Sequence, residues 1–100
     1  MDFAFYRNFI TVAETGNLSA AAKRLGIVQP ALSAQMKAIE RNYGVQLFKM
    51  QRGKRHIELT EAGETFLQQA RQLCNTEDDI SLRMQAFGRR AAGTLRFSVS

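Results

Sequence analysis

A polar helical face and a basic segment in the first 60 residues hold the side chains that could bind a ligand. Gln29 and Ser33 can form hydrogen bonds, and the segment 49–55 holds four cations within seven residues. Amide and hydroxyl groups beside clustered cations suit binding to a polyanion. A catalytic nucleophile and base would have to come from Ser33, Glu40 and His56, and nothing in their spacing brings these three together. We therefore expect a binding protein and not an enzyme.

The composition indicates one ordinary globular domain. The chain has 100 residues, of which 45% are hydrophobic, and no stretch approaches 18 uncharged apolar residues. We expect neither a membrane span nor a signal peptide, and hence a cytoplasmic protein. One cysteine, Cys74, cannot form an internal disulfide, and with a single histidine, His56, no cluster of soft metal ligands can form. We expect both residues to be structural, with no metal and no cofactor in this chain.

The positive charge is concentrated in the first part of the chain. Residues 1–60 hold nine Lys and Arg against four Asp and Glu, whereas residues 61–100 hold five of each. This asymmetry favours a polyanion partner for the first part and a protein partner for the second. The alternative on charge alone is a solvated surface that serves solubility.

Two short helices and a tight turn are predicted before residue 30. Phe5, Phe9 and Val12 recur at helical spacing and predict a first helix that starts near Asp2. A second helix over 20–25 follows, with Ser19 as its predicted cap, Gly26 at its end and, after a short link, Pro30 in the first turn of a third helix. The second and third helices, joined by this glycine-containing turn, form the helix-turn-helix pattern.

The third helix, 29–41, has two distinct faces. A narrow apolar stripe is predicted to face the core and consists of Leu32, Met36, Ile39 and Tyr43. The opposite face has no acidic residue and consists of Pro30, Ala34, Lys37 and Arg41, flanked by Ser33 and Ala38. Small residues on an exposed helical face permit close approach to another surface. We predict that the amino end of this helix enters the major groove of DNA.

A short β-hairpin is predicted after the third helix. Apolar pairs bracket a polar tip in which Gly53 allows the turn; they are Leu47 with Phe48, and Ile57 with Leu59. A basic hairpin beside a reading helix is the wing of a winged helix, and its cations, Lys49, Arg52, Lys54 and Arg55, are suited to phosphate contacts.

A long helix is predicted over 61–88, with Thr60 as its cap. Its apolar residues form a heptad seam, interrupted once by Glu77, that consists of Phe66, Ala70, Leu73, Ile80, Met84 and Phe87. A helix of roughly 40 Å cannot be covered by so small a core. The seam predicts a partner helix, most simply from a second copy of the chain, with packing on the first helix of the same protomer as the alternative for the first turns.

The last residues, 89–100, are predicted to form a hinge and the first strand of a further domain. Leu95, Phe97 and Val99 alternate with polar residues, as in a half-buried strand. A single strand cannot form a sheet by itself, so the rest of that domain is expected outside this chain.

The ordered motifs AA-x-x-L, QP-x-LS-x-Q, E-x-x-x-G, LF and LT-x-AG resemble those of the DNA-binding domain of LysR-type transcriptional regulators, and the resemblance covers about residues 3–90. The resemblance implies a winged helix-turn-helix and a dimer made through the long helix, and leaves open whether dimers of the full-length protein pair into tetramers. It also implies an effector-binding domain that begins near Thr94. Gln29, Pro30, Ala31 and Ser33 lie where this family reads bases.

Three positions depart from the family pattern. Ala34 stands where arginine is usual, so contact with a thymine methyl would replace a polar one. Met50 replaces an arginine, and Val28 replaces a hydroxyl residue that would cap the third helix. The predicted phosphate contacts come from charge and position and are Ser19, Lys37, Arg52, Lys54 and Arg55.

These observations predict a mainly α protein, a three-helix bundle with a hairpin wing over 1–60, followed by a dimerisation helix. The predicted function is sequence-specific binding of double-stranded DNA, with a homodimer reading an inverted repeat. A small-molecule effector would act only through the absent domain. The alternative function is a winged helix whose basic wing binds an acidic protein.

Overall fold

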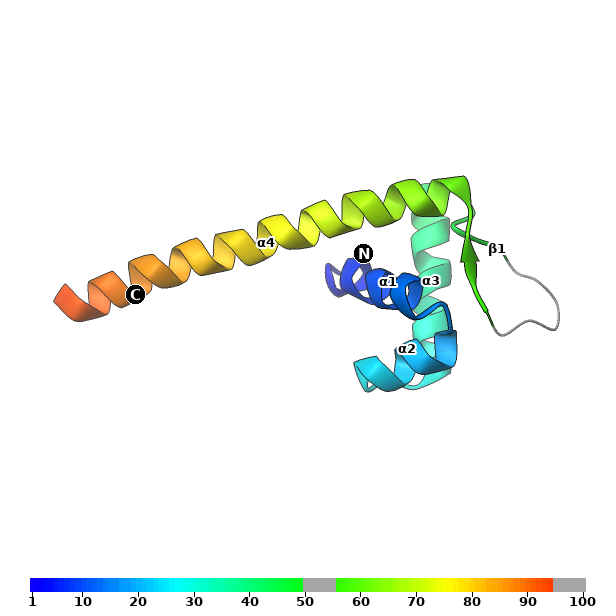
Figure 1. Cartoon of the computed structure of the whole chain (residues 1–100), viewed down its shortest axis with the longest axis horizontal. Helices are drawn as coiled ribbons and strands as arrows, with labels where there is room; N and C mark the ends of the chain where they lie inside the picture. Colours follow the sequence, from blue (N-terminus) through cyan, green and yellow to red (C-terminus); the bar gives the residue numbers. More distant parts are fainter. Residues whose placement is uncertain (50–55, 95–100) are drawn as a thin grey trace.

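The fold is a three-helix bundle with a hairpin, from which one long helix projects (Figure 1). The structure is a computed structural model that describes residues 1–49 and 56–94. Its elements are α1 (Ala4–Thr15), α2 (Leu18–Leu25), α3 (Gln29–Tyr43), β1 (Phe48–Lys49), β2 (Glu58–Leu59) and α4 (Glu61–Thr94). The two strands pair antiparallel, with Phe48 opposite Leu59. This arrangement confirms the predicted winged helix-turn-helix with a long helix after it.

The turns between the first three helices depend on left-handed glycines. Gly16 ends α1 and Gly26 ends α2, with φ angles of 66° and 71°. The predicted cap of α2 was wrong by two residues, because Asn17 accepts a hydrogen bond from the Ala20 amide at 2.9 Å and the helix begins before Ser19. Asparagine is at least as good a cap as serine, so the sequence offered two candidates for one role.

The core lies where α1, α2, α3 and β1 meet. Its buried residues come from these four elements and from Leu47, which precedes β1; they are Phe9, Val12, Ala21, Ala22, Leu32, Met36, Ile39, Leu47 and Phe48. Three of the four predicted stripe residues of α3 are therefore buried. The fourth, Tyr43, is 47% exposed, and its ring lies 5.6 Å from that of Phe66. The predicted core face of α3 is confirmed apart from this residue.

The base of the wing is tied to α3 and α4 by backbone contacts. The Glu40 carboxylate accepts from the amide of Leu47 at 2.8 Å and from that of Phe48 at 3.3 Å. Thr60 donates its hydroxyl to the Gln46 carbonyl and accepts from the Gly63 amide at 3.0 Å, so it caps α4 as predicted. These contacts fix the direction in which α4 leaves the bundle.

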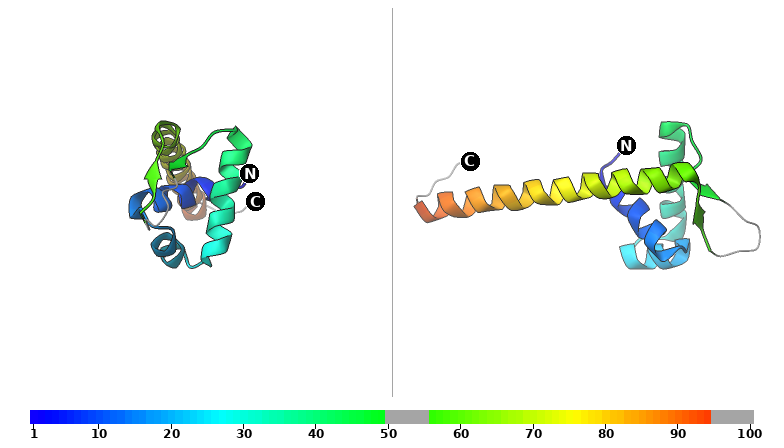
Figure 2. Two further views of the ribbon diagram at one scale, coloured as in Figure 1. Left: turned by 90° about the vertical axis from the view of Figure 1, so that its right-hand side faces the viewer. Right: turned by 45° about the horizontal axis from the view of Figure 1, so that its top comes forward.

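The amino-terminal half of α4 contacts the bundle as far as Asp78, and the rest extends away from it (Figure 2). The molecule measures 61 × 25 × 20 Å because of this helix. The helix runs through Gly88, where the sequence predicted its end, and continues to Thr94. Glycine weakens a helix by about 1 kcal/mol but does not stop it, so position 88 was a poor boundary marker. No helix in the described part of the chain has the length and apolar character of a membrane span.

Candidate nucleic-acid interface

The predicted reading face of α3 is open to solvent. Gln29, Pro30, Ala31 and Ala34 are exposed, and Ser33 is half-buried. Lys37 and Arg41 continue the same side of the helix and are also exposed. Glu40, the single carboxylate of α3, is bound by the backbone at the start of β1. The exposed face therefore carries small side chains near its amino end and cationic side chains further along, which suits approach to a negatively charged surface.

The amino end of α3 has no capping side chain. Val28 occupies the cap position in extended conformation, with φ −77° and ψ 146°, and forms no side-chain bond to the helix. The sequence predicted this loss from valine at position 28. Pro30 lies in the first turn, which holds no acidic residue. The positive end of the helix dipole is thus left available to an anion.

The side chains of Ser19 and Gln29 are joined directly. Ser19 Oγ donates to Gln29 Oε1 over 2.6 Å. The sequence predicted Ser19 as a phosphate contact, but its one hydroxyl hydrogen is directed at Gln29. Sequence reasoning did not find this contact because it joins residues ten positions apart through a turn.

Contacts with α1 set the orientation of α3. Asn8 Nδ2 donates to Gln35 Oε1 over 2.6 Å, beside the buried Met36. At the carboxyl end of α3 the hydroxyls of Tyr43 and Tyr6 form a hydrogen bond of 2.5 Å. The reading face is thus held from behind in the middle and at the carboxyl end of the helix.

The wing is described only at its base. Lys49 is exposed and lies opposite Glu58 in the strand register. The predicted phosphate contacts Arg52, Lys54 and Arg55, with Met50, fall in 50–55 and lie outside the described residues. Of the predicted phosphate contacts with described side chains, Lys37 is exposed.

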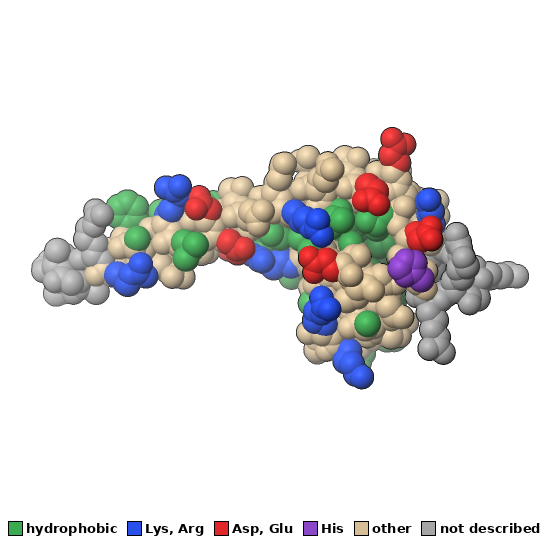
Figure 3. Space-filling view, viewed as in Figure 1, with side chains coloured by type: hydrophobic (Ala, Val, Ile, Leu, Met, Phe, Trp, Pro, Cys, Tyr) green, Lys and Arg blue, Asp and Glu red, His purple; other side chains and the backbone are tan. Residues whose placement is uncertain are grey.

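Further cations, not predicted as phosphate contacts, lie on α2. Lys23 and Arg24 occupy its last turn and are exposed, although Arg24 lies 3.8 Å from the Glu14 carboxylate. Figure 3 shows basic side chains at this end of the bundle. The charge pattern of the sequence could have indicated Lys23 and Arg24 as phosphate contacts, because α2 has no acidic residue.

The long helix divides the predicted dimerisation residues into two groups. Phe66 and Ala70 face their own protomer: the Phe66 ring contacts Tyr6, Phe9 and Tyr43, and Ala70 is 2% exposed. The first helix of the same protomer thus covers these first turns of the seam, which is the alternative that the sequence left open for them. The others are exposed in the single chain and are Leu73, Ile80, Met84 and Phe87, at 41%, 54%, 56% and 58%.

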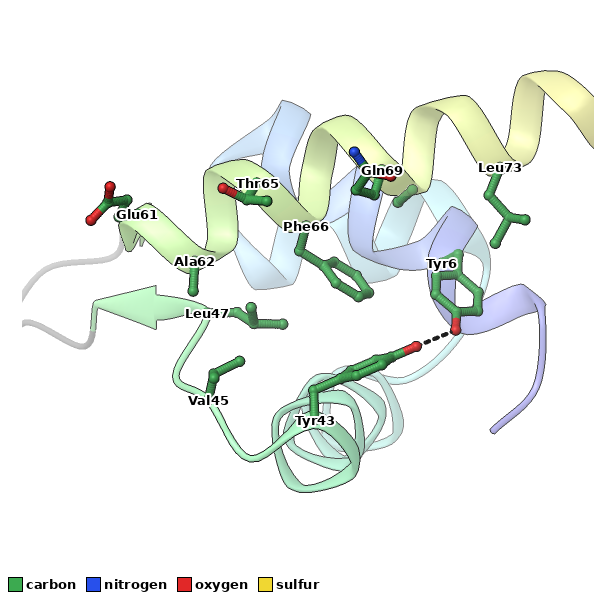
Figure 4. Close-up of a pocket in the computed structure, with 11 residues that line it drawn as sticks. Tyr6, Tyr43, Val45, Leu47, Glu61, Ala62, Thr65, Phe66, Gln69 and Leu73 are labelled. Carbon is green, nitrogen blue, oxygen red and sulfur yellow. Dashed lines mark hydrogen bonds between the residues drawn. The ribbon is translucent and has the colours of Figure 1, made fainter.

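A hollow of about 760 Å³ lies where these groups meet (Figure 4). Tyr6, Tyr43 and Phe66 line it from three helices, and Leu73 lies at its outer end. Leu73 therefore joins the hollow to the uncovered part of the seam.

The acidic interruption of the seam has a partner on α1. Arg7 binds Glu77 at 2.6 Å and Asp78 at 2.8 Å. Hydrogen bonds to Asp78 and Glu77 raise the pKa of the Arg7 guanidinium. Glu77 thus connects α4 to α1.

Cys74 lies nearby on α4. Burial raises the pKa of the Cys74 thiol, which keeps the thiol protonated and unreactive.

The structure separates His56 from the other two residues of the rejected catalytic scheme. Ser33 and Glu40 line one small hollow, whereas His56 lines another and its ring packs over Gly16. Among the residues that the structure describes, no three His, Cys, Asp or Glu side chains gather where a metal could bind.

Comparison with known proteins identifies this domain. The model of the family "Bacterial regulatory helix-turn-helix protein, lysR family" matches residues 4–64. The chain belongs to the LysR family. It is 46% identical over 96 residues to the HTH-type transcriptional regulator ClcR of Pseudomonas putida, covering 96% of this chain and 32% of ClcR. It is also 37% identical over 95 residues to the regulator BsdA of Bacillus subtilis, covering 95% of this chain and 32% of BsdA.

Solved structures of LysR-family domains share the fold. The CbnR DNA-binding domain in complex with DNA matches with a TM-score of 0.81 and 42% identity, covering 88% of this chain and 99% of that one. The BenM DNA-binding domain bound to catB site 1 DNA has the same TM-score with 32% identity, covering 88% and 97%. The chain spans about a third of the length of ClcR and BsdA.

Proposed function

We propose that this chain is the DNA-binding module of a bacterial LysR-type transcriptional regulator and binds double-stranded DNA as a homodimer. The observation that carries the proposal is the exposed face of α3, with small residues at its amino end and Lys37 and Arg41 behind them. A helix with this face fits the width of the major groove, which carries the pattern that distinguishes base pairs.

Gln29, Pro30, Ala31, Ser33 and Ala34 are the proposed base-reading residues. Lys37 and the cations of the wing would neutralise phosphates, supplying most of the affinity and most of its salt dependence. Ser19, first predicted among the phosphate contacts, is left out of this set because its hydroxyl hydrogen is given to Gln29.

The uncovered part of α4 supports the homodimer. Ile80 and Met84 expose apolar surface on a helix that leaves the bundle, where no other described segment covers them. A second copy of α4 offers the same apolar surface, as a two-fold interface requires. The two α3 helices of such a dimer would enter major grooves about 34 Å apart and read an inverted repeat.

The regulatory part of the protein would lie outside this chain. A further domain that follows α4 would bind the small-molecule effector, and the full-length protein would form dimers or tetramers in the cytoplasm. This chain itself would require no cofactor and catalyse no reaction.

Selection from a random duplex pool tests the proposal. The 100-residue chain should enrich sequences with inverted half-sites, and its affinity for the selected site should fall linearly with salt on logarithmic axes. Retention of an acidic protein at moderate salt, with no enrichment of any duplex sequence, would instead support the winged helix as a protein-binding module.

A further inference from the structure

The hydrogen bond between Ser19 and Gln29 crosses the turn of the helix-turn-helix. Ser19 Oγ donates to Gln29 Oε1 over 2.6 Å, from the first turn of α2 to the first residue of α3. Ser19 is available for this contact because Asn17 caps α2, accepting from the Ala20 amide at 2.9 Å. The Ser19 side chain on α2 thus holds the side-chain amide of Gln29, which lies at the amino end of the reading face of α3.

This bond determines which groups the two side chains still offer to DNA. A serine hydroxyl has one hydrogen, so Ser19 presents only lone pairs while it binds Gln29. The oxygen and nitrogen of the Gln29 amide lie in one plane on separate bonds of the same carbon. When Oε1 is held at α2, the direction of Nε2 and its two donors is therefore set as well. Gln29 is exposed, so those donors are accessible.

We infer that Ser19 is a positioning residue that makes Gln29 act as a hydrogen-bond donor to the base it reads. A donor pairs with an acceptor on the major-groove edge, which is N7 of a purine, O6 of guanine or O4 of thymine. Cytosine presents its N4 donor there and is selected against. The inference rests on the proposed function, because it requires α3 in the major groove.

The role of Ser19 as a phosphate contact leads to a different expectation. A phosphate contact carries no base information, so its loss weakens all sequences alike and lowers the salt slope. Loss of the Ser19 hydroxyl in our inference leaves Gln29 free to turn its amide by about 180° and offer Oε1 to a base donor. The preference then changes at one base position, and the salt slope stays the same.

Five variants of the 100-residue chain separate these roles: Ser19→Ala, Ser19→Thr, Ser19→Val, Gln29→Ala and the double variant Ser19→Ala with Gln29→Ala. Base preferences are measured by selection from a random duplex pool, and the position that loses its preference in Gln29→Ala marks the contact. Wild type should deplete cytosine at this position. Ser19→Ala should reduce the discrimination against cytosine at least fivefold there, a change of about 1 kcal/mol.

The remaining variants test whether the effect passes through Gln29. Ser19→Thr keeps a hydroxyl and should keep the wild-type preference. The double variant should match Gln29→Ala, because Ser19 has nothing left to position. Ser19→Val provides a second pair with Ser19→Thr, in which two branched side chains of similar shape differ in the hydroxyl, so the comparison also holds if Ser19→Ala unfolds.

Three results would overturn the inference: cytosine enriched by wild type at the Gln29 position, an unchanged base profile in Ser19→Ala and Ser19→Val, or the same altered profile in Ser19→Thr. If wild type selects an inverted repeat while the Ser19 variants share its profile, the inference fails and the proposed function stands. If wild type selects no sequence, both fail.

Discussion

The ring of Phe66 on α4 lies edge-on against the ring of Phe9 on α1, with 4.7 Å between the ring centres and 78° between the planes. Phe9 is fully buried, so this contact joins the long helix to the centre of the core. Phe66 is also the first member of the heptad seam. The seam therefore begins as an intramolecular contact and becomes available to a second copy only further along.

Phe66→Ala should destabilise the folded chain strongly. It removes an aromatic side chain that contacts three other rings, and we expect the free energy of unfolding to fall by about 3 kcal/mol. Urea unfolding at one fixed chain concentration measures the effect. Gln72→Ala, an exposed change on α4, is the control and should alter stability by less than about 0.5 kcal/mol. Equal stability of the two variants would contradict the placement of Phe66 in the core.

Ile80→Asp should weaken the dimer instead of the fold. Ile80 is 54% exposed in the isolated chain and lies beyond the bundle, so a carboxylate there is tolerated until a second copy covers it. We expect the dimer Kd to rise at least tenfold, or about 1.4 kcal/mol. Sedimentation equilibrium measures this constant, with the exposed Gln85→Ala as control. An unchanged Kd would exclude this part of α4 from the interface.

Two glycines in α4 should respond oppositely to alanine. A Cβ at Gly63 would lie 2.1 Å from the Leu47 carbonyl oxygen, whereas one at Gly88 would meet nothing within 4 Å. Gly63→Ala must push the wing base away from α4, and we expect a loss of about 2 kcal/mol or more. Gly88→Ala should increase helix stability by about 0.5 to 1 kcal/mol. Thermal unfolding of the two variants, followed by circular dichroism, measures both changes in stability. A Gly63→Ala variant as stable as wild type would contradict the close approach of Gly63 to the Leu47 carbonyl.

The parts of the fold that the sequence predicted are those with local causes. The stripe Leu32, Met36 and Ile39 follows from helical periodicity, and Thr60 capping follows from its place before an acidic first turn. A heptad pattern, however, does not state which helix covers it, so for Phe66 and Ala70 the sequence offered both a second copy and the first helix of the same protomer. The partners of Ser19 and Glu77 depend on residues far along the chain, and no local pattern indicates them.

Alkaline pH should destabilise the chain through Tyr6. The hydrogen bond with Tyr43, together with burial, raises the pKa of Tyr6 above its ordinary value of 10.0. The folded chain therefore holds this proton more tightly than the unfolded one, so the contribution is complete below about pH 10 and is lost as the pH rises through the folded pKa. Urea unfolding at about pH 8 and about pH 11 should show a larger loss in wild type than in Tyr6→Phe. Equal losses would mean that the hydroxyl pair does not affect stability.

Gln29 and Lys37 should contribute to DNA binding in different ways, although both lie on the exposed side of α3. Gln29→Ala removes a base contact and should cost about 1 to 3 kcal/mol on the selected site, with little loss on random duplex. Lys37→Ala removes a phosphate contact and should weaken both duplexes alike while lowering the salt slope by about one unit. Titrations by fluorescence anisotropy at several salt concentrations separate the two effects. Arg83→Ala on the projecting part of α4, where Arg83 pairs with Asp79, is the matched control for lost charge. If Gln29→Ala weakened selected and random duplexes equally, Gln29 would be a backbone contact, and base reading would have to come from the residues that follow it on α3.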